Sequence, residues 1–409
     1  MSEGSSGPFR EAKRATTRPP FSIILSITLT GIMGNVLVTP VAPDIAAEFG
    51  EGTSGVGLLL AAATAPGVLL APVIGVLADR YGRRAVVVPC LALFGIAGGL
   101  GGFAPTFATL VALRFLQGCG AAGLVNLAVV IVGDHWDGAD RARMLGRNAA
   151  ALTASIAVLP PLGGALAELW GWRATFAPYW IGVGTAIAAL VFLPPSVRGD
   201  GTLRQQLQRT RPYLAHPTVI ASTAMAFVLF VIIFGLFLTV LPVYLRDDFG
   251  VGAGGRGLIL AAPSVTSTAM ALSLGRFRAR FGAPRLLVAG SVMLAAGVAI
   301  LAVAPNLPIL VLGPVVYGFG EGLLIPTLQD VVSGVPPQSS RGAVVALFVG
   351  VTRLGQTVGP VGSGAALSVV SATTVFWVGA VASALLAAGQ PFVRGRVRAR
   401  QELAAPVTN

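Results

Sequence analysis

The chain has 409 residues, of which 55% are hydrophobic and 11% are charged, and its formal net charge is +12. Soluble domains contain about 25% charged residues, so this composition excludes a water-soluble globular protein and makes the lipid bilayer the solvent. The positive charge does not require a nucleic-acid partner, because basic loops beside anionic lipid account for it.

Six apolar runs in each half of the chain are long enough to cross a bilayer, which takes roughly 20 helical residues. A polar, basic segment at 1–20 comes first and is predicted to be a disordered cytoplasmic tail. The runs follow at 21–42, 54–78, 85–104, 108–132, 144–168, 174–194, 217–245, 256–275, 285–304, 307–332, 342–367 and 371–393. A polar linker at 198–216 separates a half at 21–197 from a half at 217–394, and 395–409 form a second cytoplasmic tail. The sequence therefore predicts an all-α membrane protein with 12 transmembrane helices.

The two halves repeat one another at a constant offset of 200 residues. The offset relates Gly55/Gly255, Gly57/Gly257, Gly75/Gly275, Arg80/Arg280, Gly82/Gly282, Gly118/Gly318, Gly120/Gly320, Pro160/Pro360 and Gly164/Gly364. This period is too long for a solenoid, and duplicated, pseudo-symmetric membrane halves are the natural interpretation. Six spans per half is an even number, so both halves have the same orientation, and the functional site is expected between them.

The basic residues predict which side of the membrane each loop occupies. Of 28 Lys and Arg residues, 23 lie in the tails, the linker and the loops around 80, 141, 280 and 341. Three lie on the opposite side (Arg173, Arg246 and Arg256), and Arg114 and Arg353 fall within spans. This bias places both termini and the linker in the cytoplasm. We call the helix ends nearest the basic loops the predicted cytoplasmic end, and the opposite ends the predicted outer end.

Cysteine and histidine give no sign of a metal site or cofactor. Cys90 and Cys119 lie in apolar runs, where each serves as a small apolar residue, and His135 and His216 have no Cys or second His nearby. The sequence also lacks a phosphate-binding loop of the Gly-rich Lys-Ser/Thr kind, which argues against ATP drive by this chain alone. We expect no metal, no cofactor and no enzymatic activity.

A basic turn after the second predicted span carries the first motif, which reads Gly75-Val-Leu-Ala-Asp79-Arg80-Tyr-Gly82-Arg83-Arg84. Gly75 permits close helix approach and Gly82 permits a tight turn. Asp79 can lie at a neighbouring helix N-terminus, where the helix dipole favours a carboxylate. This segment and its position resemble the major facilitator superfamily.

That resemblance implies the two-half, 12-helix facilitator fold and a conformational clasp. In it, Asp79 holds the C-terminal half in the outward-open state, and Arg83 or Arg84 faces Asp134 at the end of the fourth span. The second copy of the motif has Ala279 where Asp79 stands, so one charged clasp is expected. A merely solvated basic turn is the alternative.

Two further motifs extend the resemblance. Arg114-Phe-Leu-Gln117-Gly118 resembles the superfamily's Arg-x-x-x-Gly motif, and an intramembrane Arg is a functional candidate because it is expensive to bury. Pro160, Gly163 and Gly164 resemble the Gly-Pro-x-x-Gly-Gly motif of drug:proton antiporters, with Leu159 in place of the leading Gly, and Gly359 and Pro360 stand at the matching place in the second half. This likeness implies efflux rather than uptake. Kinking and close packing of membrane helices are the alternative explanation for the same prolines and glycines.

Glu321 and Arg353 are the most functional-looking charges. Each lies about 12 residues from the cytoplasmic end of its span, which places both roughly 18 Å deep at 1.5 Å per residue. Glu321 is therefore the predicted proton carrier, with Arg353 and Arg114 as the other residues of proton coupling. A permanent Glu321–Arg353 ion pair is the alternative. The polar residues expected to line the cavity are Asn35, Gln117, Asn126, Tyr317 and Gln356.

These features together predict a secondary transporter of the cytoplasmic membrane that works by alternating access. It is expected to act as a monomer and to export amphipathic small molecules or drugs against inward proton flow. One rival is a facilitator or proton symporter of a small polar solute, in which Glu321 or Arg353 binds the substrate. The other is a non-transporting membrane scaffold or receptor.

Overall fold

The computed structural model describes residues 18–194, 213 and 215–387, and the regular structure within these residues is helical. The N-terminal half contains α2 (Phe21–Val36), α3 (Ala42–Glu48), α4 (Thr53–Tyr81), α5 (Arg83–Leu100), α6 (Phe107–Ala121), α7 (Leu124–His135), α8 (Gly138–Trp170) and α9 (Ile181–Phe192). The C-terminal half contains α11 (Pro217–Val231), the π-helical segment η4 (Ile232–Val240), α12 (Leu241–Asp247), α13 (Ala253–Val303), α14 (Leu307–Gly334) and α15 (Gln338–Ala366). An apolar helix at Ala372–Ala387 follows them. The predicted tails and linker lie almost wholly outside the described residues.

Ten helical segments of the described chain are long and apolar enough to cross a membrane. One of them, α13, has 51 residues and turns at Gly282, so it is long enough for two crossings. The helix Ala372–Ala387 is shorter than the ten. The predicted number of 12 is reached when α13 is counted twice and this short helix is added.

The repeat also reproduces local structure. Gly82 ends α4 with a φ of 95°, and Gly282 bends α13 with a φ of 74°, a backbone region that glycine adopts without steric cost. The Thr106 hydroxyl accepts the Thr109 N–H at 3.2 Å at the start of α6, and the Asn306 side chain accepts the Ile309 N–H at 3.1 Å at the start of α14. The two halves therefore break and begin their helices at equivalent positions.

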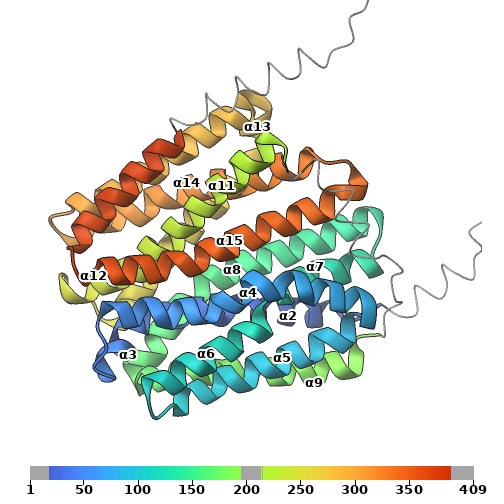
Figure 1. Cartoon of the computed structure of the whole chain (residues 1–409), viewed down its shortest axis with the longest axis horizontal. Coiled ribbons are helices and arrows are strands. Elements are labelled where there is room, and N and C mark those ends of the chain that lie inside the picture. Colours follow the sequence, from blue (N-terminus) through green and yellow to red (C-terminus); the bar gives the residue numbers. More distant parts are fainter. Residues whose placement is uncertain (1–17, 195–212, 214, 388–409) are drawn as a thin grey trace, which may run out of the picture.

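Figure 1 shows α4, α5, α6 and α9 of the N-terminal half on one side and α11, α13 and α14 of the C-terminal half on the other. Each half has its own apolar core. Ile27, Leu91 and Ile131 are fully buried in the N-terminal half, and Leu294 and Phe376 are fully buried in the C-terminal half. Large side chains that face outward remain apolar: Leu69 is 75% exposed and Leu272 is 84% exposed. A lipid environment makes such exposure favourable, whereas water would not.

The two halves contact one another along α4 with α15 and along α8 with α13. The polar contacts that join them lie at the predicted outer end and toward the middle of these helices. Toward the predicted cytoplasmic end, a Cβ added at Gly75 or Gly275 would meet no other atom within 4 Å. The halves are therefore closed together at the predicted outer end and separate at the opposite end.

Candidate functional site between the two halves

Four residues of the repeat form close contacts between the halves at the closed end. A Cβ at Gly57 of α4 would collide with the carbonyl of Pro360 in α15, and a Cβ at Gly257 of α13 would collide with the carbonyl of Pro160 in α8. These are the same two residue types, 200 positions apart, meeting from opposite sides of the interface. Small residues are what allow membrane helices to approach this closely.

The remaining glycines of the antiporter-like motif divide between two kinds of contact. Gly164 lies against the Ala253 backbone and Gly364 against the Thr53 backbone, so both close the interface between the halves. Gly163 and Gly359 instead pack within their own halves, against α2 and α11 respectively. The packing explanation of these prolines and glycines, left open by the sequence, is the one that these contacts support.

The glycine contacts predict that Gly257→Ala will disfavour closure of the predicted outer end. The added methyl group would overlap the backbone of Pro160 and Pro161 in α8. The halves must therefore separate by some tenths of an ångström or more to make room for it. Electron paramagnetic resonance measures the separation of the halves directly, as the distance between spin labels attached at the exposed positions Pro105 and Pro305, one in each half. Gly275→Ala, on the same helix but with nothing within 4 Å, is the matched control and should leave the distances unchanged. Equal distances in both variants would contradict the prediction.

A polar seam continues from the closed end toward the middle of α4 and α15. The Thr53 hydroxyl donates to the Gly364 carbonyl at 3.1 Å, and the Thr64 hydroxyl to the Gln356 carbonyl at 3.2 Å. The guanidinium of Arg353 donates to the Gln356 side chain at 3.1 Å. The aliphatic stem of Arg353 faces Gly67 of the other half, so this charge lies at the interface between the halves.

Glu321 lies on α14 one helical turn from Tyr317, whose ring stacks on Phe237 with a centroid distance of 4.8 Å. Tyr317 is 1% exposed and its hydroxyl has no hydrogen-bond partner, whereas Glu321 is partly buried. No ion pair or hydrogen bond of the described residues joins Glu321 to Arg353, whose guanidinium bonds Gln356 instead. The alternative of a Glu321–Arg353 ion pair is therefore not formed in this structure. Glu321 and Arg353 were predicted to lie at the same depth in the membrane, but equal depth does not by itself place two side chains in contact.

Arg114 is the centre of a buried network among α2, α6 and the helical segment η3 (Trp172–Trp180). One terminal nitrogen donates to the Gly34 carbonyl at 2.8 Å and to the Gln117 side chain at 2.7 Å, and the other bonds the Asn35 side chain. The Tyr179 hydroxyl lies 3.4 Å away and donates to the Gly34 carbonyl at 2.7 Å. Neutral oxygen atoms thus surround the guanidinium. Two predicted cavity residues, Asn35 and Gln117, belong to this network.

At the predicted cytoplasmic end, Arg83 bonds the Asp79 carboxylate and also donates to Asp134 at 3.0 Å. The predicted contact between this turn and Asp134 is present through Arg83, while Arg84 donates instead to the Leu193 carbonyl at 3.4 Å. Asp79 is bonded within the N-terminal half here, in a structure whose halves are separate at this end. The clasp from Asp79 to the C-terminal half was predicted for the outward-open state, and it stays a prediction.

A small cavity of about 100 Å³ lies beside this turn. Asp79, Arg83 and Gly75 line it together with Asn126, which is exposed on α7. Asn126 therefore lies with the clasp residues and not with Gln117. Arg80 is exposed, and its guanidinium lies 5.4 Å from the centre of the Tyr81 ring.

Several charged contacts were missed by sequence reasoning. Arg278 pairs with Asp330 between α13 and α14, which gives the C-terminal half a charge contact of its own at the predicted cytoplasmic end. The three arginines of the predicted outer end are all paired with carboxylates: Arg173 with Glu48 at 2.6 Å, and Arg246 and Arg256 with Asp44. The sequence did carry one signal for these contacts: the three arginines lie on the side of the membrane where the positive-inside rule expects few.

Among the described residues, no group of three or more His, Cys, Asp or Glu side chains could hold a metal ion, and Cys90 and Cys119 are free thiols.

Comparison with known proteins agrees with this architecture. Tetracycline resistance protein, class G, of Vibrio anguillarum is 28% identical over 91% of this chain and 97% of its own length. The bacillibactin exporter of Bacillus subtilis is 31% identical over 38% of this chain, and the match spans 39% of that exporter. Among solved structures, a bacterial homolog of the human lysosomal transporter Spinster, in an inward-facing and unoccupied conformation, has a TM-score of 0.74 at 17% identity, covering 95% of this chain and 96% of that one. This structural likeness shows the fold.

The family assignment comes from a match that spans both halves. The model of the Major Facilitator Superfamily matches residues 24–255 and 223–406, and so covers most of the chain. The chain belongs to the major facilitator superfamily.

Proposed function

We propose that this protein is a proton-coupled exporter of amphipathic small organic molecules that works by alternating access as a monomer. Its relatives include proteins named as a tetracycline resistance protein and a bacillibactin exporter, and the family consists of transporters and not enzymes. Export is supported by these names.

The proposal of proton coupling depends on the surroundings of Glu321 in α14. A proton carrier needs an acid that is free to exchange its proton as its surroundings alternate between the two sides. Glu321 is partly buried near the middle of α14, and no carboxylate or cation is bonded to it among the residues whose side chains the structure describes. Glu321 is therefore not an ion-pair partner in this conformation, which supports proton transfer as the role of an acid at this depth.

The contacts between the halves support alternating access. Between α4 and α15 they are built from glycines, carbonyl oxygens and a few hydroxyl groups, which separate at low cost when the halves rock. A large apolar interface would instead resist opening. We place both termini in the cytoplasm of a cell whose cytoplasmic membrane holds the protein, supported by the basic loops and by the pairing of all three outer arginines with acids.

Proteoliposomes with an imposed pH gradient test the proposal. A fluorescent amphipathic dye is loaded on the side that corresponds to the cytoplasm, and the gradient is applied in either direction. We expect dye to move against its own gradient when protons move the opposite way, and the vesicle interior to change pH as substrate is added. Movement of dye and protons in the same direction would support the symporter, and no movement under either gradient would support the scaffold.

A further inference from the structure

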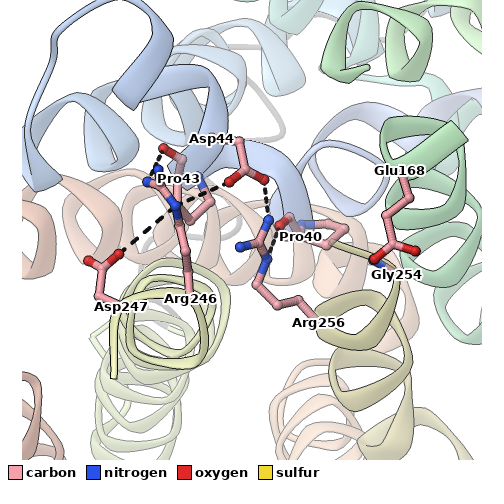
Figure 2. Close-up of polar contacts among 8 residues, drawn as sticks. All are labelled: Pro40, Pro43, Asp44, Glu168, Arg246, Asp247, Gly254 and Arg256. Carbon is pink, nitrogen blue, oxygen red and sulfur yellow. Dashed lines mark hydrogen bonds and ion pairs between the residues drawn. The ribbon is translucent and has the colours of Figure 1, made fainter. Parts of the chain in front are cut away.

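A cluster of charges at the predicted outer end joins the two halves, and Figure 2 shows it from one side. Asp44, at the start of α3, faces two arginines of the other half. Arg246 of α12 approaches it at 3.2 Å, and Arg256 of α13 bonds its second oxygen. Both arginines also donate to backbone carbonyls of the same turn, Arg256 to Pro40 at 2.7 Å and Arg246 to Pro43 at 2.9 Å.

Arg256 is 2% exposed, and every hydrogen-bond acceptor recorded for it belongs to the other half of the molecule. Separation of the halves at this end therefore removes all of these partners at once. A buried guanidinium that loses its carboxylate is costly unless water reaches it. Opening must accordingly break these bonds and hydrate the arginine in the same step.

Glu168, at the end of α8, adds a second contact across the interface. Its carboxylate accepts the backbone N–H of Gly254 at 2.7 Å, in the first turn of α13. The first N–H groups of a helix have no partner within the helix, and the positive end of the helix dipole favours a carboxylate there. Glu168 thus caps a helix that belongs to the other half.

The cluster is present on one side of the pseudo-symmetry only. The residues 200 positions from Asp44, Arg246, Arg256 and Glu168 are Tyr244, Ala46, Val56 and Ser368. On the opposite side of the interface, between α4 and α15, the described residues form one side-chain hydrogen bond at this end, from the Thr53 hydroxyl to the Gly364 carbonyl, beside the packing of Gly57 on Pro360. Neither the repeat nor the motifs of the family predict the charged side.

We propose that Asp44, Arg246, Arg256 and Glu168 form a one-sided outer latch, whose breakage determines how often the predicted outer end opens. The proposal rests on the proposed function in one respect, since alternating access requires this end to open in each cycle.

Two further acids lie near the latch. Asp247 is 4.0 Å from Arg246, and Asp248 follows it, where burial and then the charge of Asp247 raise its pKa. Neither bridges the halves.

Spin-label distances between the two halves test the latch without substrate or gradient. Cys90 and Cys119 are first replaced by alanine, and labels are attached at Pro105 and Pro305. We expect Asp44→Asn to raise the ratio of open to closed outer ends by about tenfold or more, because it removes the one carboxylate of the described residues that is bonded to Arg256. Glu168→Gln should raise the ratio by about two- to fivefold, because it weakens one helix-end contact.

Two variants make the outcome unambiguous. Glu48→Gln is the matched control, because Glu48 pairs with Arg173 at the same end but within one half, and it should leave the distances unchanged. Arg246→Gln carries the test if Asp44→Asn lowers the yield of folded protein, since Arg246 is partly exposed and its loss leaves no cation buried alone. The double variant of Asp44→Asn with Arg256→Gln should shift the opening equilibrium by less than the sum of the two single changes in free energy, as expected of coupled residues.

Unchanged distances in both Asp44→Asn and Arg246→Gln would overturn the latch. So would an equal opening in the Glu48→Gln control. These results are independent of the proposed function: a protein that shows the expected distances but moves no dye under a pH gradient keeps the latch and loses the exporter. Variants that export dye but show unchanged distances would support the exporter and contradict the latch.

Discussion

Replacing Glu321 by glutamine is expected to abolish uphill transport driven by a pH gradient while substrate exchange continues. Glutamine keeps the size and hydrogen bonding of a protonated glutamate but cannot release a proton, so the variant is held in one protonation state. A proton carrier must lose gradient-driven movement under this change. Counterflow of labelled against unlabelled substrate needs no proton release and should remain.

The structure also predicts the stability of this variant. A glutamate that neutralised Arg353 would, on replacement, leave a buried arginine unpaired, which typically costs about 3–5 kcal/mol. Arg353 bonds Gln356 and not Glu321, so we expect the thermal unfolding temperature of Glu321→Gln in detergent to equal or exceed that of the parent. Removal of a partly desolvated charge acts in the same direction.

Glu51→Gln is the control, because Glu51 is exposed in the loop before α4 and should affect neither readout. A folded Glu321→Gln protein that still concentrates dye against its gradient would remove Glu321 as the carrier. A protein that unfolds at a much lower temperature would instead establish a structural role for the acid in a conformation other than this one.

Local features of the fold could be predicted from the sequence because they are repeated and short-range. The offset of 200 residues identifies two halves, and it also places the turns at Gly82 and Gly282 and the contacts of Gly57 and Gly257 at equivalent positions. Apolar length predicts where helices cross the membrane. The residues that end them are less certain from hydropathy, since α8 begins at Gly138 whereas the predicted span begins at 144.

The candidate site was harder to predict, because its contacts join residues far apart in the chain. Depth along a helix can be counted, and it placed Glu321 and Arg353 at one level, but it does not say which face of each helix meets which neighbour. The outer latch joins Asp44 to Arg256, 212 positions away, without a counterpart in the other half. The repeat therefore gave no second copy from which to recognise it, and a count of charges showed only that arginines lie where the positive-inside bias does not expect them.

Arg114 carries the last prediction, in which Arg114→Lys is expected to behave almost as badly as Arg114→Ala. The guanidinium is 1% exposed and uses two different nitrogens to hold Gln117 and Asn35, which come from different helices. An arginine presents these donors in a fixed planar fork, whereas a lysine offers one compact ammonium group. With lysine, at least one buried acceptor loses its partner, at a cost of about 1–3 kcal/mol for each.

We expect Arg114→Lys to lower the thermal unfolding temperature and to reduce transport to a small fraction of the parent rate. Arg143→Lys is the matched control, because the Arg143 side chain is 62% exposed and pairs with Asp140 on the same helix, where the pair contributes little. It should change neither readout. Because the acceptors of Arg114 are neutral oxygens, geometry and not charge decides this site. Full stability and full transport in Arg114→Lys would show the reverse: that a positive charge anywhere in this pocket is sufficient.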